Sequence, residues 1–143
     1  MKPSSTVTYT LRALVDLAIH QETGPVTVAA VAKRQGIPLR YLEQLFNRLR
    51  RKGIVSAERG PRGGYHLRSH PREIALHTIF QIVESEGASS RKSLSASDPT
   101  ASVWRQLEAA VQTTLQATTL ETLVVKAREQ AVSPLNHLYT FHI

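Results

Sequence analysis

Residues 34–65, RQGIPLRYLEQLFNRLRRKGIVSAERGPRGGY, predict a helix followed at once by a glycine-rich hairpin. Pro38 is favourable in a first helical turn and opens the predicted helix, PLRYLEQLFNRLRRK, which ends at Gly53. Four apolar residues at helical spacing form its inward face: Leu42, Leu45, Phe46 and Leu49. The polar residues occupy outward or flanking positions: Arg40, Glu43, Gln44, Asn47, Arg50 and Arg51.

Two short extended runs follow this helix, IVSAER and YHLR, and the loop GPRGG joins them. In the second run Tyr65 and Leu67 alternate with His66 and Arg68, as expected of a half-buried strand. We therefore predict a β-hairpin with a glycine-rich tip.

Two shorter helical segments precede the central stretch. Residues 5–21 carry apolar side chains at helical spacing, and TGPV ends this first helix. Thr27 can cap a second helix, VAAVAKRQ, and Gly36 stands where a helix ends in the left-handed conformation. Two short helices joined by a glycine turn match a helix-turn-helix, and the hairpin makes the unit a winged helix.

The second half of the chain changes character after residue 84. A helix is predicted for EIALHTIFQIVE, and seven of the next eighteen residues are serine, which favours a flexible linker. Asp98 and Pro99 predict the N-cap and first residue of a long helix. Thr118 and Glu121 match a capping box for a last helix, LETLVVKARE. The tail, AVSPLNHLYTFHI, fits either a strand or packed coil.

These segments divide the chain into three parts. We expect a winged helix-turn-helix DNA-binding domain at 1–84, a Ser-rich linker at 85–97, and dimerisation helices with a tail at 98–143. The fold class is mostly α. Four residues of the long helix form a stripe that a domain this small cannot cover by itself, so we expect them at a homodimer interface: Val103, Leu107, Val111 and Leu115. Trp104 is expected at the interface or in the core, with a ligand pocket around it as the alternative.

The positive charge lies in one segment. The formal net charge is +7, but residues 33–72 hold eleven of the 18 Lys and Arg residues and two of the 11 acids, so this segment carries +9. A polyanion is the natural partner of such a field, and a basic face kept for solubility is the alternative. The third helix fits the major groove of B-DNA, and we expect Arg50 on it to bind DNA. Arg59 and Arg62 at the hairpin tip can enter a narrow minor groove.

The motifs YLEQLF and RGP-GGY, within residues 34–65, resemble the signature of the IscR/NsrR/CymR family of bacterial winged-helix regulators, often called the Rrf-two family. The resemblance implies a homodimer whose long helices pack together. It also implies that Arg40, Tyr41, Glu43 and Gln44 contact DNA from the recognition helix and that Arg59 contacts the minor groove. Arg62 adds a cation to the tip, so affinity is expected to be less selective for sequence than in relatives.

One departure from the family concerns its cofactor. Members that sense iron–sulfur status, nitric oxide or redox state hold a cluster with cysteines in the segment between the fourth helix and the long helix. This chain has no cysteine, so we expect no such cluster and no other cofactor or thiolate metal site. The six histidines form no recognisable metal-ligand motif.

Other function classes have weaker support. GPRGG lacks the GK[ST] ending of an NTPase phosphate loop, and Asp16 with His20 has no nucleophile beside it, so we expect no enzyme. No apolar run reaches the length of a membrane span, and a soluble, cytoplasmic protein is expected. We predict a sequence-specific DNA-binding transcriptional regulator that acts as a repressor, with a winged-helix protein-interaction module as the alternative. The signal stays open between a small molecule, a protein partner and protein abundance.

Overall fold

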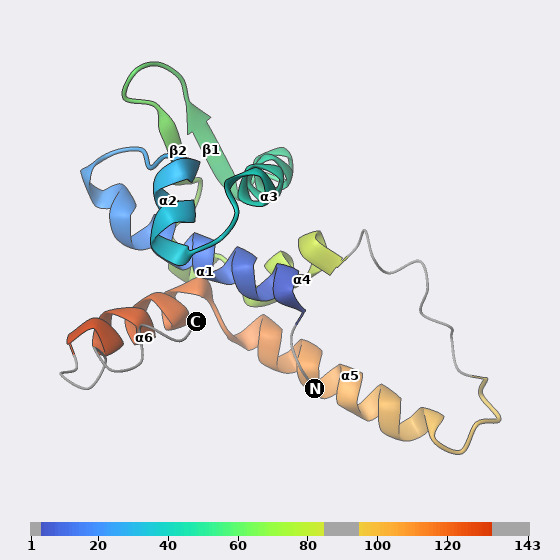
Figure 1. Cartoon of the computed structure of the whole chain (residues 1–143). Helices are drawn as coiled ribbons and strands as arrows, with labels where there is room; N and C mark the ends of the chain where they lie inside the picture. Colours follow the sequence, from blue (N-terminus) through green and yellow to red (C-terminus); the bar gives the residue numbers. More distant parts are fainter. Residues whose placement is uncertain (1–3, 85–94, 133–143) are drawn as a thin grey trace.

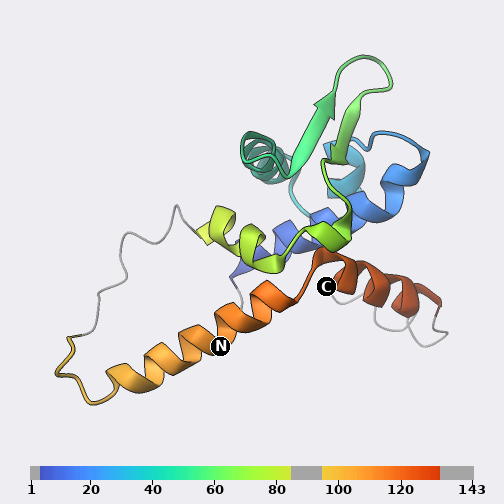
Figure 2. The same cartoon turned by 180° about the vertical axis from the view of Figure 1, so that it is seen from behind.

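The computed structural model describes residues 4–84 and 95–132. Residues 4–84 form a mostly helical part, called the head from here on, and one long helix of the second range extends away from it (Figures 1 and 2). The helices are α1 (Ser5–His20), α2 (Val28–Gln35), α3 (Leu39–Arg51), α4 (Leu76–Glu84), α5 (Ala101–Ala117) and α6 (Leu120–Val132). A hairpin of β1 (Val55–Glu58) and β2 (Gly64–Leu67) stands at the end of the head farthest from α5 and α6. Two 3-10 turns, η1 (Gln21–Thr23) and η2 (Pro71–Glu73), complete the described elements.

Local capping explains the boundaries of the first two helices. Ser4 begins α1 by accepting a hydrogen bond from the Val7 N–H at 3.2 Å, and Thr27 begins α2 by accepting one from the Ala30 N–H at 3.1 Å. Gly36 ends α2 with φ of 65°, the left-handed conformation that glycine adopts at no steric cost. The predicted helix-turn-helix is therefore present.

The helix α3 buries the predicted face: Leu42, Leu45, Phe46 and Leu49 are all at most 4% exposed. Its start differs from the prediction. Pro38 has an extended ψ of 130° and serves as the N-cap, so the helix begins one residue later at Leu39. Lys52 is the C-cap, and Gly53 follows it as expected.

The two strands form an antiparallel hairpin whose register pairs Val55 with Leu67 and Glu58 with Gly64. A third segment joins this sheet, because the Val26 and Tyr65 backbones exchange hydrogen bonds of 2.9 and 2.7 Å. The close approach requires glycine next to Tyr65: a Cβ at Gly64 would lie 2.6 Å from the Val26 carbonyl oxygen. The hairpin is thus fixed to the η1–α2 connection.

Two predicted helix starts in the second half of the chain are wrong. Ile74 lies before α4, because its carbonyl accepts from the Leu120 N–H at 2.8 Å while the Leu76 N–H donates to the Thr118 carbonyl at 2.9 Å. Asp98 precedes the N-cap of α5, which is Thr100, and its carboxylate accepts from the Thr100 N–H at 2.8 Å. Hydrogen bonds from the Thr100 hydroxyl and N–H lower the pKa of Asp98.

The predicted capping box at Thr118 and Glu121 is also displaced. Thr118 is the C-cap of α5, and its hydroxyl donates to the Thr114 carbonyl at 2.7 Å. Because α6 begins at Leu120, Thr118 stands one residue too early for the N-cap. Most of the predicted linker and the tail from residue 133 lie outside the described residues.

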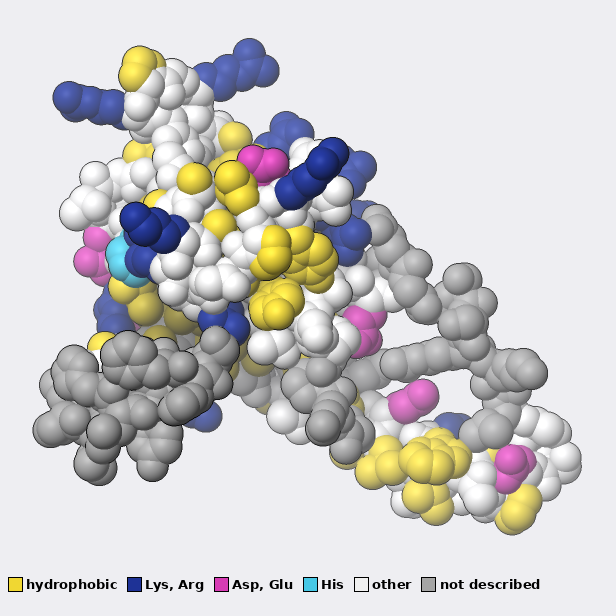
Figure 3. All heavy atoms as spheres, viewed as in Figure 1, with side chains coloured by type: hydrophobic (Ala, Val, Ile, Leu, Met, Phe, Trp, Pro, Cys, Tyr) yellow, Lys and Arg dark blue, Asp and Glu magenta, His cyan; other side chains and the backbone are white. Residues whose placement is uncertain are grey.

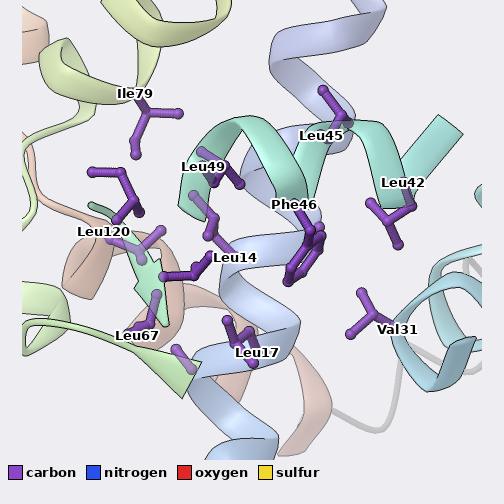
Figure 4. Close-up of a cluster of buried hydrophobic side chains, with 14 of the residues drawn as sticks. Leu14, Leu17, Val31, Leu42, Leu45, Phe46, Leu49, Leu67, Ile79 and Leu120 are labelled. Carbon is purple, nitrogen blue, oxygen red and sulfur yellow. The ribbon is translucent and has the colours of Figure 1, made fainter. Parts of the chain in front are cut away.

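A single buried cluster joins the head to α6 (Figure 4). Leu14 and Leu17 of α1 lie between Phe46 of α3 and Leu120 of α6, and all four are fully buried. Burial of a Leu or Phe side chain stabilises the fold by ~1.5–3 kcal/mol. Val124 of α6 is also 2% exposed. The core therefore includes residues from both the predicted DNA-binding part, 1–84, and the predicted dimerisation part, 98–143. The division of the chain into these parts stays a prediction.

Candidate nucleic-acid interface

The outer face of α3 presents polar side chains opposite its buried leucines. Arg40, Glu43, Gln44 and Arg50 are all exposed, as predicted for residues that read DNA. Asn47 is exposed on the same face, and its Oδ1 accepts a hydrogen bond from Arg50 Nη2 at 2.8 Å. The helix therefore offers both cationic donors and the carboxylate and amide groups that pair with base edges.

Tyr41 differs from the other residues assigned to this face by resemblance. It is half-buried, and its hydroxyl donates to Thr6 Oγ1 of α1 at 2.8 Å. Its ring meets Tyr9 edge-on, with 5.8 Å between centroids. In this structure Tyr41 joins α3 to the start of α1, and its DNA contact stays a prediction.

The hairpin, called the wing from here on, places Arg59 and Arg62 in its exposed tip. A hydrogen bond of 2.9 Å from the Gly63 N–H to the Gly60 carbonyl closes a turn that contains Arg62 and directly follows Arg59. Figure 3 shows Lys and Arg side chains projecting from this tip and from the head near it, with few acidic side chains on the viewed face. The wing tip and the outer face of α3 thus both carry exposed arginine side chains.

Packing fixes the wing relative to α3. The Tyr65 ring of β2 meets the buried Phe46 ring of α3 edge-on, with 5.0 Å between centroids. Gln21 Oε1 accepts from the Leu67 N–H at 2.8 Å, so η1 holds the other end of β2. These contacts hold the wing and α3 at a defined separation. A protein that contacts a major and a minor groove of the same DNA at once needs such a fixed separation.

An ion pair between the buried Asp16 and the exposed Arg34, not identified from the sequence as such, positions α2 against α1. Asp16 is 3% exposed and accepts hydrogen bonds from Arg34 Nη2 at 2.7 Å and from Gln35 Nε2 at 2.8 Å. The hydrogen bond to Asp16 raises the pKa of Arg34, so the guanidinium stays charged. Arg12 adds a bond to the Gln35 carbonyl at 2.7 Å. The signal in the sequence was an acid among the apolar residues of the first helix.

The long helix α5 exposes an apolar stripe. Val103, Trp104 and Leu107 are 53%, 52% and 42% exposed, and Val111 and Leu115 are partly exposed. Figure 3 shows apolar side chains gathered on α5, away from the head. The structure therefore leaves uncovered the residues that the sequence assigned to a dimer interface.

No group of three or more His, Asp or Glu side chains within residues 4–84 and 95–132 could hold a metal ion. Asp16, which the sequence placed beside His20, uses its carboxylate in the ion pair with Arg34. Among the described helices, none combines the length and the apolar composition that crossing a membrane requires.

Known proteins are similar to most of the chain. A family model named Rrf2 and described as "Iron-dependent Transcriptional regulator" matches residues 3–126. The HTH-type transcriptional regulator IscR of Pectobacterium atrosepticum is 38% identical over 130 residues, which cover 87% of this chain and 79% of the relative. IscR of Photorhabdus laumondii is 41% identical over 130 residues, with the same coverage of 87% and 79%.

Two solved structures have the same fold. IscR of T. potens superposes with a TM-score of 0.78 at 34% identity, covering 97% of this chain and 96% of the other. CymR, the global cysteine regulator of B. subtilis, has a TM-score of 0.76 at 32% identity, covering 88% and 98%. These similarities confirm the predicted mostly α fold with a winged helix-turn-helix and the resemblance on which it partly rested.

Proposed function

The chain belongs to the Rrf2 family of transcriptional regulators, and from this premise we propose that it is a homodimeric repressor that binds DNA sequence-specifically. The observation that carries the proposal is the exposed polar face of α3 beside the arginines of the wing. The relatives named above are regulators, not enzymes.

The proposed reader is α3. An α-helix with its side chains is about 10–12 Å wide and fits a major groove about 12 Å wide. Glu43 can accept a hydrogen bond from the N4 amine of cytosine, and Gln44 can pair with adenine through its amide. Arg40 and Arg50 flank them and can contact bases or phosphates. Because Phe46 is buried below this face, the helix can present these groups without losing its packing.

The proposed anchor is the wing. Arg59 and Arg62 are exposed at a narrow turn, a shape that can approach a minor groove closely. The minor groove distinguishes bases poorly, so these arginines add affinity more than selectivity. Tyr65 and Gln21 hold the wing to the head, which supports a fixed spacing between the two grooves.

The proposed dimer interface is α5. Val103 and Leu107 are large, apolar and exposed, and a stripe of this kind marks an interaction surface in a protein that is otherwise polar outside. A second copy is the natural partner, because two-fold dimers present two heads to the two half-sites of a palindromic operator. Val111 and Leu115 continue the stripe toward the head.

Iron dependence, which the description of the family model names, does not fit this chain. The 143 residues contain no cysteine, so the chain supplies no thiolate ligand for an iron–sulfur cluster. His, Asp and Glu side chains do not gather into a metal-binding group in the part of the chain that the structure describes. The proposed function therefore includes no iron site.

Selection from a random DNA pool followed by binding titrations tests the proposal. We expect enrichment of a palindromic site. For about six neutralised phosphates the log–log salt slope is about −5, which weakens binding about a thousandfold between 50 and 200 mM salt. If no sequence is enriched and salt hardly changes the affinity for DNA, the result would instead favour the alternative function, a winged-helix module that binds a protein partner.

A further inference from the structure

Among the described residues, large apolar side chains that are well exposed occur at five positions: Leu39, Val103, Trp104, Leu107 and Val125. Four of them lie on α5 and α6, and the three on α5 belong to its apolar stripe. Leu39 is the exception, because it lies on the head and is the first residue of α3. Leu39 is 43% exposed, although Leu42, less than one helical turn away, is fully buried.

The position of Leu39 puts it at the end of the proposed reading helix that reaches the bases first. In a helix-turn-helix, the N-terminal residues of the recognition helix contact the base edges. Leu39 and Glu43 are four residues apart and therefore lie one above the other on the same side of α3. Helical side chains lean toward the N-terminus, so Leu39 covers the surface just beyond the start of α3.

The neighbouring residues do not bury Leu39. Phe46 and Leu42 point into the core and are 0% exposed, whereas Pro38 before it and Arg40 after it are both exposed. Pro38 makes no side-chain capping hydrogen bond, so no polar side chain of the N-cap crosses this end of the helix. A leucine is thus presented at a place where the rest of the outer face is polar.

The major groove offers one apolar feature that such a side chain fits, the C5-methyl group of thymine. We propose that Leu39 contacts the C5-methyl group of a thymine in each half-site and so selects thymine over cytosine at that position. This inference rests on the proposed function, since it requires α3 to lie in the major groove. It adds an apolar contact to the hydrogen bonds expected of Glu43 and Gln44.

Replacement of thymine by deoxyuridine tests the contact, because it removes only the methyl group and leaves the base pair. Each thymine of the selected site is replaced in turn, at symmetric positions of both half-sites. We expect wild-type affinity to fall at one symmetric position by about fourfold per half-site, which corresponds to ~0.8 kcal/mol, the value of one buried methyl-sized group.

The variant Leu39→Ala should bind thymine and deoxyuridine sites equally at that position. Val125→Ala is the matched control, since Val125 is also 43% exposed but lies on α6, and this variant should keep the preference for thymine. Circular dichroism checks that both variants fold, and the uracil scan of the wild-type protein needs no variant at all.

Two results would overturn the inference alone: a wild-type protein that is insensitive to deoxyuridine at every thymine of a site it selects, or Leu39→Ala retaining the full preference. Failure of the wild-type protein to select any site would overturn the proposed function and this inference with it. The two failures are therefore distinguishable, because only the second occurs before any thymine is replaced.

Discussion

Replacement of Asp16 by alanine removes the acceptor on which the contact between α1 and α2 depends. The carboxylate accepts from Arg34 Nε at 3.2 and 3.0 Å, from Arg34 Nη2 at 2.7 Å, and from Gln35 Nε2 at 2.8 Å. The side chain of Asp16 is 1% exposed, whereas that of Arg34 is 36% exposed. In Asp16→Ala the amide donor of Gln35 and part of the guanidinium would be left without this acceptor.

The expected loss follows from this burial. Removing one partner of a fully buried ion pair costs about 3–5 kcal/mol. Water can reach the partly exposed Arg34 guanidinium, so we expect a smaller loss in unfolding free energy, about 2–4 kcal/mol. The pKa of Arg34 is raised in the folded protein, so the ion pair stabilises the fold at every pH below the ordinary pKa of arginine. This contribution of Arg34 therefore does not change near neutral pH.

Glu22→Ala provides the matched control. Glu22 pairs with Arg128 at 2.9 Å, but the two side chains are 69% and 53% exposed. An exposed pair of this kind contributes about 0–1 kcal/mol. Each variant thus removes the carboxylate of an ion pair with arginine, and the two carboxylates differ in burial, with Asp16 buried and Glu22 exposed.

Urea unfolding followed by circular dichroism, at one protein concentration, measures both losses. For Asp16→Ala we expect a lower midpoint with an unchanged m-value. If Asp16→Ala lost no more unfolding free energy than Glu22→Ala, the ion pair would not be what holds α2 against α1.

Three further predictions concern the dimer, the wing and the cofactor. Leu107→Arg places a charge in the apolar stripe of α5. Light scattering should then give a monomer of 15.9 kDa for the variant and twice that mass for the wild-type protein. A wild-type monomer at micromolar concentration would contradict the proposed dimer. Gly64→Ala brings a Cβ to 2.6 Å from the Val26 carbonyl oxygen, so we expect the free energy of unfolding, measured by thermal unfolding, to fall by about 1–3 kcal/mol. An unchanged unfolding temperature would refute that close approach. Protein purified without oxygen should be colourless and should bind DNA equally before and after exposure to air, since no thiolate is present; a visible absorption band with stoichiometric iron and sulfide would disprove this.

Regular patterns in the sequence predicted most of the head. The spacing of Leu42, Leu45, Phe46 and Leu49 defined the buried face of α3, and this face is buried as expected. Thr27 and Gly36 marked both ends of α2 through local capping chemistry, which depends on neighbours in sequence. The exposed residues of α3 follow from the same periodicity, because whatever does not face the core faces outward.

Interactions between residues distant in sequence were harder to predict. The bonds between Asp16 and Arg34 join residues eighteen positions apart, and only the packing of α1 against α2 brings them together. Ile74 was expected in a helix, but its carbonyl pairs with the Leu120 N–H instead. Tyr41 was assigned to the DNA-reading face by resemblance, and its hydrogen bond to Thr6 depends on where α1 begins relative to α3.

Affinities of Gln44→Ala and Arg59→Ala for the selected site and for random DNA test the central claim, that α3 reads the sequence while the wing anchors it. Gln44→Ala should lose roughly 1–3 kcal/mol on the selected site and little on random DNA. Arg59→Ala should weaken binding to both and make the salt slope shallower by about one unit for each phosphate that is no longer neutralised. Equal losses for Gln44→Ala on the two DNAs would contradict the assignment of α3 as the reader.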